Sequence, residues 1–259
     1  MKRRFFLTSV PVMMGLGTQG FVSGNFRSAI LGSTPTWGYL GEEGPDSWAR
    51  LSSEFSSCAL GNQQSPIDLL ATAKAGPLNL EIDYGATPLK ILHNSHTIQI
   101  NVEVGHSLRL EGVKFELLQF HFHHPSEHHL NGQIYPLEVH FVHQSPTGAL
   151  AVLGVFLEVG SDTSEYTKIW GHLPTIVKSE TLIPGVTLDL ARLLPTDSAL
   201  YRYYGSLTTP PCSESVQWLI FETGIAISAE QVHQFAQIFP RNARPLQALN
   251  KRKILRSQT

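Results

Sequence analysis

Short runs in which apolar and polar residues alternate set the class of fold that this chain can adopt. Pro or Gly interrupts the sequence every 8–15 residues, and the runs between these breaks are rich in Val, Ile, Phe and Thr. A period of two residues in such segments is typical of β-strands with one buried face. The segments with this pattern are 89–92, 97–102, 107–110, 113–124, 137–143, 149–158 and 215–223. The sequence therefore predicts a mainly β fold.

Helices are expected to be few, short and peripheral. The clearest covers residues 229–239, where apolar residues recur on one face and where Ser228 and Gln231 occupy the positions of a capping box. Two others are expected over 164–173 and near 46–55. No linker, repeat or low-complexity block divides the chain, and 42% of its residues are hydrophobic, which is enough to fill a core. These observations indicate one domain.

The first 30 residues have the composition of an export signal. They contain no acidic residue but four basic ones, Lys2, Arg3, Arg4 and Arg27. A basic start followed by an apolar run is the layout of a signal peptide, and residues 3–8 resemble a twin-arginine signal. A Sec-type signal or a flexible arm is the alternative, and cleavage near Ser28-Ala29 lacks a clear A-x-A pattern. We expect an exported domain, 31–259, in the periplasm or outside the cell.

Charge and hydropathy exclude two classes of partner. Beyond residue 30 the chain holds 15 Lys and Arg against 21 Asp and Glu, a net charge of −6. This balance does not suit nucleic-acid binding. No later apolar run reaches the ~18–20 residues that span a bilayer, so no transmembrane segment is expected in the mature chain.

The mature region contains two cysteines, Cys58 and Cys212. An exported protein with a small, even number of cysteines usually pairs them. We therefore expect a disulfide between them, and two buried free thiols are the alternative.

Histidines gather in one part of the sequence. Seven of the twelve lie between His121 and His143. Alternation along the expected strands places His121 and His123 on one face, and His140 in a later strand can face the same way. Since neighbouring strands lie ~4.8 Å apart and side chains at i and i+2 emerge ~7 Å apart, the three imidazoles can converge on one ion. Three neutral imidazoles with an open fourth position are the ligands of a catalytic zinc site.

Polar neighbours support this metal site. Gln119 and Glu138 precede His121 and His140 by two residues, so each lies on the same strand face as its histidine. There they can accept a hydrogen bond from the histidine's second ring nitrogen. A metal-bound histidine usually needs such an acceptor to fix its orientation. Exposed or hydrogen-bonded histidines on a surface strand are the alternative, because an H-x-H motif alone is weak in a chain with twelve histidines.

Five groups of motifs occur in one order along the chain, between about Trp37 and Arg252. They are Trp37-Gly38-Tyr39 with Gly44-Pro45, Gln64-Ser65-Pro66-Ile67-Asp68, Gln119-Phe120-His121-Phe122-His123 with Ser126-Glu127-His128 and Glu138-Val139-His140-Phe141-Val142-His143, Ser206-Leu207-Thr208-Thr209-Pro210-Pro211-Cys212-Ser213-Glu214, and Asn242-Ala243-Arg244-Pro245-Leu246-Gln247. With these motifs the chain resembles the alpha-class carbonic anhydrases, of the bacterial, exported type.

This resemblance implies a single domain built on a large, mostly antiparallel central β-sheet with short peripheral helices. It also implies zinc-dependent, reversible hydration of carbon dioxide to bicarbonate and a proton. His121, His123 and His140 would hold Zn²⁺ with a water as fourth ligand, and the resulting hydroxide would be the nucleophile. Thr208 would accept the hydrogen of this hydroxide and donate its own to Glu127, which fixes the orientation of the nucleophile.

The resemblance further assigns residues to the substrate and to the proton. Carbon dioxide would lie against an apolar wall of Val142, Val152, Leu207 and Trp218, beside Thr208 and Thr209. His96 would carry the proton to solvent, since the unperturbed pKa of histidine suits reversible proton uptake near neutral pH. Tyr39, Asn94, Gln99 and Thr209 would line the water chain that leads to it. Sulfonamides and anions are expected inhibitors.

Two other classes of function stay open on the sequence. A cupin-type jelly roll also uses H-x-H, a later Glu and a distant His, which His121, His123, Glu127 and His140 could imitate with iron or manganese. The chain lacks the second cupin signature, and its metal content would separate the two. A non-catalytic binding module on the same fold is the other alternative, and a hydration assay decides that question.

Overall fold

The computed structural model describes residues 36–70, 78–161, 165–197 and 199–257. The predicted export segment, 1–30, lies outside the described residues. Strands dominate this part of the chain, as the alternating pattern predicted. They are β1 Asp68–Leu69, β2 Leu80–Asp83, β3 Ala86–His93, β4 Ile98–Asn101, β5 Ser107–Leu110, β6 Val113–His123, β7 His129–Leu130, β8 Leu137–Gln144, β9 Leu150–Val159, β10 Lys178–Asp189, β11 Leu200–Ser206, β12 Glu214–Phe221, β13 Ile225–Ile227 and β14 Leu255–Ser257.

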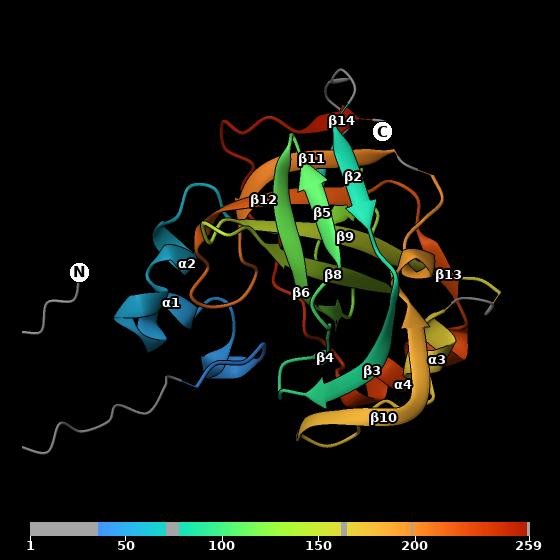
Figure 1. Cartoon of the computed structure of the whole chain (residues 1–259). Helices are drawn as coiled ribbons and strands as arrows, with labels where there is room; N and C mark the ends of the chain where they lie inside the picture. The colour runs from blue at the N-terminus through green and yellow to red at the C-terminus, as the bar shows by residue number, and fades with distance from the viewer. Residues whose placement is uncertain (1–35, 71–77, 162–164, 198, 258–259) are drawn as a thin grey trace, which may run out of the picture. The chain divides into compact units, whose positions relative to one another are not determined.

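The helical elements are short and lie beside the strands (Figure 1). They are the 3₁₀ turns η1 Gly41–Glu43, η2 Ser53–Phe55 and η3 Leu190–Leu193, and the helices α1 Trp48–Leu51, α2 Ser57–Leu60, α3 Tyr166–Trp170 and α4 Ala229–Ile238. The capping box predicted for α4 is present, because Ser228 Oγ accepts from Gln231 N and Gln231 Oε1 accepts from Ser228 N. No helix among the described residues is long and apolar enough to cross a membrane.

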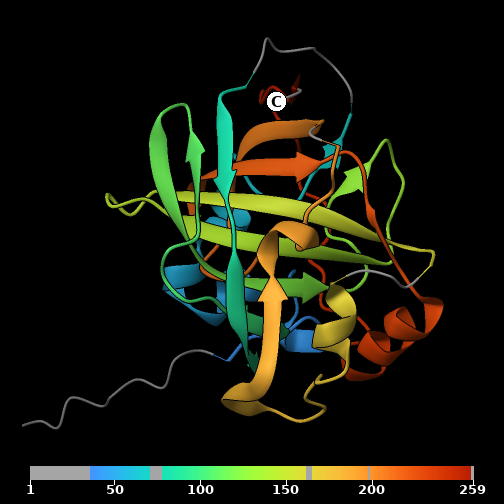
Figure 2. The ribbon, with the colours of Figure 1, turned by 45° about the vertical axis from the view of Figure 1, so that its right-hand side comes forward.

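In the described part of the chain, twelve strands join one sheet in the order β10-β3-β4-β6-β8-β9-β12-β11-β14 (Figures 1 and 2). Strand β5 pairs with β6 and β2, and β13 pairs with β9. The pairs are antiparallel except for β9 with β12 and β9 with β13. The predicted large, mostly antiparallel sheet is therefore confirmed. The histidine-bearing strands β6 and β8 are neighbours in its interior.

A bulge at Leu118 sets the register of β6 against β8. Leu117 pairs with His143, but the next pair joins Gln119 to Val142, so Leu118 is the extra residue. The buried side chains of β6 are Phe115 and Leu117 before the bulge and Phe120 and Phe122 after it. The bulge thus exchanges the two faces of the strand. As a result, side chains on both sides of the bulge contact the same core. After the bulge, His121 and His123 alternate with Phe120 and Phe122 and therefore point to the opposite face.

Each face of the sheet carries its own core. The larger core contains the Phe residues of β6, the inner side chains of β3 and β4, and α3 with α4, which lie side by side in both views (Figures 1 and 2). Trp170 of α3 donates from Nε1 to the carbonyl of Gln231 in α4, which joins the two helices. The smaller core contains Val152, Phe156, Tyr203 and Trp218 and lies on the histidine face.

The structure differs from the local predictions in two helices and in several strands that were not expected, among them β2, β10 and β11. The helix expected near 46–55 is a succession of short turns, α1, η2 and α2, because the backbone is extended at Ser52, whose side chain accepts from Glu54 N and starts a new turn. The helix expected over 164–173 is limited to α3. Strand β10 was not expected, since Pro184-Gly185 breaks its alternation; it is a mostly exposed edge strand, where such a break is tolerated.

Candidate metal centre

Three histidines meet on the inner face of β6 and β8. His121 and His140 are register partners across the two strands, and His123 follows His121 on the same face. The ring centroids lie 5.0 Å apart for His121 and His123, 5.5 Å for His121 and His140, and 4.6 Å for His123 and His140. One nitrogen of each ring lies within 4.8 Å of the nitrogens of the other two.

The second nitrogen of each ring is held by an acceptor. His121 donates from Nδ1 to Gln119 Oε1 at 2.8 Å, and His140 donates from Nε2 to Glu138 Oε1 at 2.8 Å. His123 donates from Nδ1 to the main-chain carbonyl of Asn242 at 2.8 Å. These bonds fix the tautomers, so Nε2 of His121, Nε2 of His123 and Nδ1 of His140 are the nitrogens free to bind a metal.

Two buried atoms in the described part of the chain lack a hydrogen-bond partner at this place. They are Nε2 of His123 and Oε2 of Glu127, which lie 3.5 Å apart. A buried polar group without a partner is costly, and such an atom calls for an explanation. A cation between the three nitrogens would satisfy His123. The donor set, three imidazoles with no thiolate, suits zinc.

The protonation of these rings also fits a metal. Burial, together with the nearby His123 and His140, holds the pKa of His121 well below its ordinary value. Burial likewise lowers the pKa of His123, although Glu127 opposes the shift. Burial disfavours charge on His140 too, but the adjacent Glu138 carboxylate outweighs it and raises the pKa. Neutral imidazoles at two of three positions are ready to bind a metal without losing a proton.

A buried chain of hydrogen bonds extends from His140 away from the metal centre. Glu138 Oε1 accepts from His140 and from Nδ1 of His128 at 2.7 Å, and its Oε2 accepts from the main-chain N–H groups of Glu127 and His128. Nε2 of His128 accepts from the Tyr203 hydroxyl at 2.7 Å. Burial opposes charge on Glu138, but His128 and His140 outweigh it and hold its pKa well below the usual range. Since His128, Glu138 and His140 satisfy one another, this group does not need a metal.

His143, in the same strand as His140, lies on the opposite face. Its Nε2 accepts from the Tyr84 hydroxyl at 2.5 Å and its Nδ1 donates to the carbonyl of Ala151. Burial lowers its pKa to about 3. This histidine is a neutral core residue and takes no part in the metal centre.

The predicted apolar wall comes together beside His140. Val142, Val152 and Trp218 are register partners across β8, β9 and β12, and Leu207 packs against the same core. The ring of Trp218 stands edge-on to His140 with the centroids 4.8 Å apart. Gly154 keeps space open in this row, because a Cβ there would lie 2.4 Å from Ile220 Cδ1 and 3.2 Å from Glu138 Oε1.

Three of the residues predicted for the proton path lie at the start of β4: Asn94 and His96 precede the strand and Gln99 is part of it. Asn94 donates to Gln99 Oε1 at 3.2 Å, and Gln99 is the register partner of His121. His96 is half-buried and stacks on Trp37 with the ring planes 4° apart and the centroids at 3.7 Å. Burial lowers its pKa. Burial and the charge of Glu127 raise the pKa of Tyr39 well above its ordinary value, so its hydroxyl stays protonated.

Thr208 is buried in the loop between β11 and β12. The loop is closed by a bond from Leu207 N to the carbonyl of Ser213 and by another from Cys212 N to the carbonyl of Thr209. The hydrogen bond expected from Thr208 to Glu127 is not formed among the described residues: Oε1 of Glu127 accepts from Arg244 N at 2.8 Å, and Oε2 has no partner. Oε2 is thus the atom left for the Thr208 hydroxyl.

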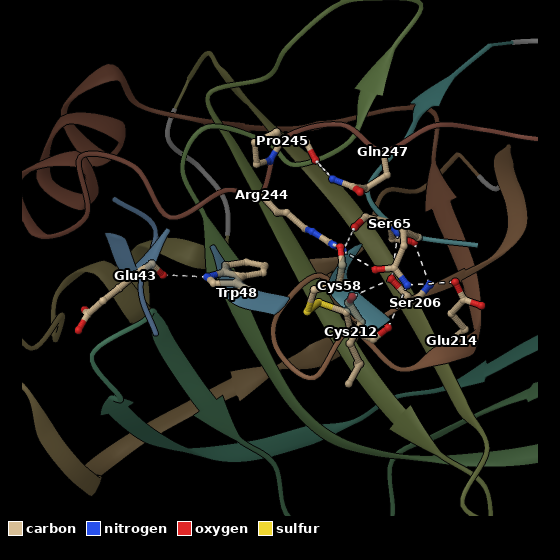
Figure 3. Close-up of a disulfide and its surroundings, with 12 residues drawn as sticks. Glu43, Trp48, Cys58, Ser65, Ser206, Cys212, Glu214, Arg244, Pro245 and Gln247 are labelled. Atoms are coloured by element: carbon tan, nitrogen blue, oxygen red, sulfur yellow. Dashed lines mark hydrogen bonds between the residues drawn. A yellow bond between two sulfur atoms is a disulfide. The ribbon is translucent and has the colours of Figure 1, made fainter. Parts of the chain in front are cut away.

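A disulfide joins Cys58 to Cys212, as predicted, with the Cα atoms 5.0 Å apart (Figure 3). No free cysteine exists in the described part of the chain. The bond closes a loop of 154 residues and connects α2 to the end of the Thr208 loop.

Asn242 is a site residue that sequence reasoning did not single out. Its carbonyl holds His123, and its Nδ2 donates to the carbonyls of His96 at 3.0 Å and Phe122 at 2.9 Å. It therefore ties the segment that carries His96 to the strand that carries the metal-facing histidines. A main-chain carbonyl has no signature in the sequence, so only the motif at 242–247 could have pointed to it.

Comparisons with known proteins agree with this geometry. Residues 43–258 match the family described as eukaryotic-type carbonic anhydrase. A carbonic anhydrase of Nostoc is 41% identical over 248 residues, which cover 94% of this chain and 93% of that protein. The alpha-carbonic anhydrase of Thermovibrio ammonificans, solved with the inhibitor sulfanilamide, superposes with a TM-score of 0.83 at 39% identity, over 86% of this chain and all of that one. That of Photobacterium profundum gives 0.80 at 41% identity, over 85% of this chain and all of that one.

Proposed function

We propose that this chain, which belongs to the eukaryotic-type, or alpha, carbonic anhydrase family, uses zinc held by His121, His123 and His140. The reaction of this family is the reversible hydration of carbon dioxide. One observation supports the zinc assignment above the others. The three histidines direct one nitrogen each toward a common point, their second nitrogens are all engaged, and Nε2 of His123 is buried without a partner in the described residues.

Zinc would supply an acidified water at its open position, a property for which carbonic anhydrases are the standard example. The chain supplies the rest. Gln119, Glu138 and the carbonyl of Asn242 hold the three rings in the tautomers that metal binding needs. A cupin-type iron or manganese centre is disfavoured, since those metals favour carboxylate ligands and the cluster of His121, His123 and His140 offers imidazole nitrogens alone.

The side chains beside His140 suit a small apolar substrate. Carbon dioxide carries no charge and no hydrogen-bond donor, so the wall of Val142, Val152, Leu207 and Trp218 can hold it while excluding bulk water. Thr208 and Thr209 follow Leu207 in the loop after β11, and we place them beside this wall. We assign Thr208 the role of orienting the nucleophile, with Glu127 as the acceptor of its hydroxyl proton. The unpartnered Oε2 of Glu127 supports that assignment.

His96 is our candidate for the proton acceptor at the solvent side. It is half-buried, it is not hydrogen-bonded through its ring among the described contacts, and it lies beyond Asn94 and Gln99 on the path from His121. Its stacking on Trp37 gives the imidazole a defined resting place near the surface. Tyr39, Asn94, Gln99 and Thr209 would line the water chain between the two ends of this path.

Stopped-flow hydration of carbon dioxide by the zinc-loaded domain tests the proposed function. We expect turnover that a sulfonamide abolishes in a one-to-one complex, because the anionic sulfonamide nitrogen would take the open position on zinc. The sulfanilamide complex of the Thermovibrio protein motivates the choice of inhibitor. A zinc-loaded protein that neither hydrates carbon dioxide nor binds a sulfonamide would instead be a binding module.

The His96→Ala variant is expected to lose kcat by about 100-fold in weak buffer, the low end of what positioned proton-transfer groups contribute, while kcat/KM for carbon dioxide stays nearly unchanged. The reason is that proton export follows the hydration step. Added imidazole should restore much of kcat. His93→Ala is the matched control, because His93 lies on the same segment but its ring packs, tilted, against that of Phe239. An equal fall of kcat and kcat/KM would move His96 into the hydration step.

We also propose that residues 1–30 are an export signal of the twin-arginine type and that the domain acts in the periplasm or outside the cell. The acid-free, basic start and the disulfide support this location. Sequencing the N-terminus of the secreted protein would give the cleavage site.

A further inference from the structure

Two adjacent residues, Gln64 and Ser65, hold both ends of the loop that carries Thr208. At the start of the loop, Ser65 N donates to Ser206 Oγ at 2.9 Å and Ser206 N donates to Ser65 Oγ at 3.1 Å. At its end, Gln64 Nε2 donates to the carbonyl of Cys212 at 3.1 Å. The loop is therefore fastened at residues 206 and 212 by side chains and main-chain groups that the disulfide does not include.

Arg244 completes a second connection between the two cysteines. Figure 3 shows Arg244 beside Cys58 and Ser65. Its Nη2 donates to the carbonyl of Cys58 at 2.9 Å, and its Nη1 donates to Gln64 Oε1 at 2.9 Å and to the carbonyl of Ser65 at 2.8 Å. The path Cys58–Arg244–Gln64–Cys212 thus runs beside the disulfide and consists of hydrogen bonds alone. We call these two bridging residues, Gln64 and Arg244, the clip.

The clip also reaches the proposed partner of Thr208. The main-chain N–H of Arg244 donates to Glu127 Oε1 at 2.8 Å. The fork of its guanidinium fixes where that N–H lies, because the side chain is bound on one side to Gln64 and Ser65 and on the other to Cys58. One residue therefore relates the position of Glu127 to the position of the Thr208 loop.

The burial of the clip is unusual for such polar groups. Gln64 is 4% exposed and Arg244 is 3% exposed. Arg244 also lies over the ring of Trp48, 5.5 Å from its centroid. Burial lowers the pKa of Arg244 to about 10, against the attraction of Glu127, so the group stays charged near neutral pH. A buried charge is costly unless it is fully hydrogen-bonded, which gives the arrangement a defined geometry.

Gly61 and Gly205 allow the Gln64-Ser65 segment to pack closely against the Thr208 loop. A Cβ at Gly61 would lie 2.3 Å from Gln64 Nε2 and 2.4 Å from Glu214 Oε1. A Cβ at Gly205 would lie 2.1 Å from Ser65 Oγ. Any side chain at either position would push the Gln64-Ser65 segment away from the loop. The contacts of the clip therefore depend on close approach from both sides.

We propose that Gln64 and Arg244 are positioning residues that act in parallel with the disulfide to keep Thr208 within reach of Glu127. This inference rests on the proposed function, because that function gives Thr208 and Glu127 their roles. Either connection alone suffices to hold the Cys212 end of the loop. The loss of one is thus tolerated, and the loss of both releases this end, while Ser65 still holds Ser206.

A double-mutant cycle tests this redundancy. The four proteins are the parent, Gln64→Met, the pair Cys58→Ser with Cys212→Ser, and the combination. We expect each change alone to lower kcat/KM for hydration by about threefold and the combination to lower it by about 100-fold, the loss that a displaced catalytic group produces. Zinc should remain at one per chain, since the ligands lie on β6 and β8. The pH midpoint of kcat/KM should not move, because the metal centre sets it.

Two further measurements separate this role from general destabilisation. Reducing the disulfide of the folded Gln64→Met protein should abolish most activity, whereas reducing that of the parent should change activity little. Because the disulfide is removed after folding, a loss of activity cannot come from a cysteine-free chain that fails to fold. Gln247→Met is the matched control, since the Gln247 side chain bonds only its own segment at Pro245. Arg244→Lys should sensitise the enzyme to reduction as Gln64→Met does, because lysine lacks the fork, and the exposed Arg241→Lys should not.

The outcomes are distinguishable. Losses in the combined variant that equal the product of the single losses within about twofold would overturn the clip, as would loss of zinc at the same step. An inactive parent protein with bound zinc would overturn the proposed function instead.

Discussion

The His140→Ala variant is expected to lose both tightly bound zinc and hydration activity. Two imidazoles from one strand cannot close a tight tetrahedral site, and His140 is the ligand that the neighbouring strand supplies. The substitution also removes the donor to Glu138 Oε1, which then keeps only His128 at that oxygen. Metal analysis after dialysis and stopped-flow hydration measure the two losses.

The control for this experiment is His233→Ala, an exposed histidine of α4, which should keep full zinc and activity. Retention of one tightly bound zinc per chain by His140→Ala would contradict the ligand assignment. Activity lost while zinc is retained would point to another role for His140.

The Thr208→Val variant is expected to keep its zinc but to lose about 100-fold in kcat/KM. Valine has the shape of threonine without the hydroxyl, so the nucleophile loses its orienting group and Oε2 of Glu127 loses its expected donor. Thr208→Ser retains the hydroxyl and serves as the matched control. Hydration kinetics with parallel zinc analysis check the result, and a valine variant with nearly parental kcat/KM would remove Thr208 from the reaction.

The parts of this molecule that could be predicted are those governed by local pattern. Alternation is a property of consecutive residues, so the strands that carry His121, His123 and His140 and their common face follow from the sequence. The helix α4 follows from its apolar period and its capping residues. The pairing of Cys58 with Cys212 needed only that two cysteines lie beyond a predicted export signal.

The contacts that could not be predicted involve main-chain atoms and residues that lie far apart in the sequence. The carbonyl of Asn242 that holds His123, and the N–H of Arg244 that holds Glu127, are groups that every non-proline residue has. Nothing in the sequence marks those two as the ones that contact the site. Edge strand β10 escaped for a different reason: an edge needs only one partner, so its sequence is free to include Pro184 and exposed polar residues.

The bulge at Leu118 limits which insertions and deletions strand β6 can tolerate. Between Val113 and Gln119, the number of residues decides which side chains of β6 face the phenylalanine core and which face the metal centre. An insertion or deletion of a single codon there exchanges the faces of one half of the strand and carries Phe120 or His121 to the wrong side. Point substitutions at the exposed Leu118 leave that parity intact. Natural variation at this position should therefore be free in residue type and fixed in length.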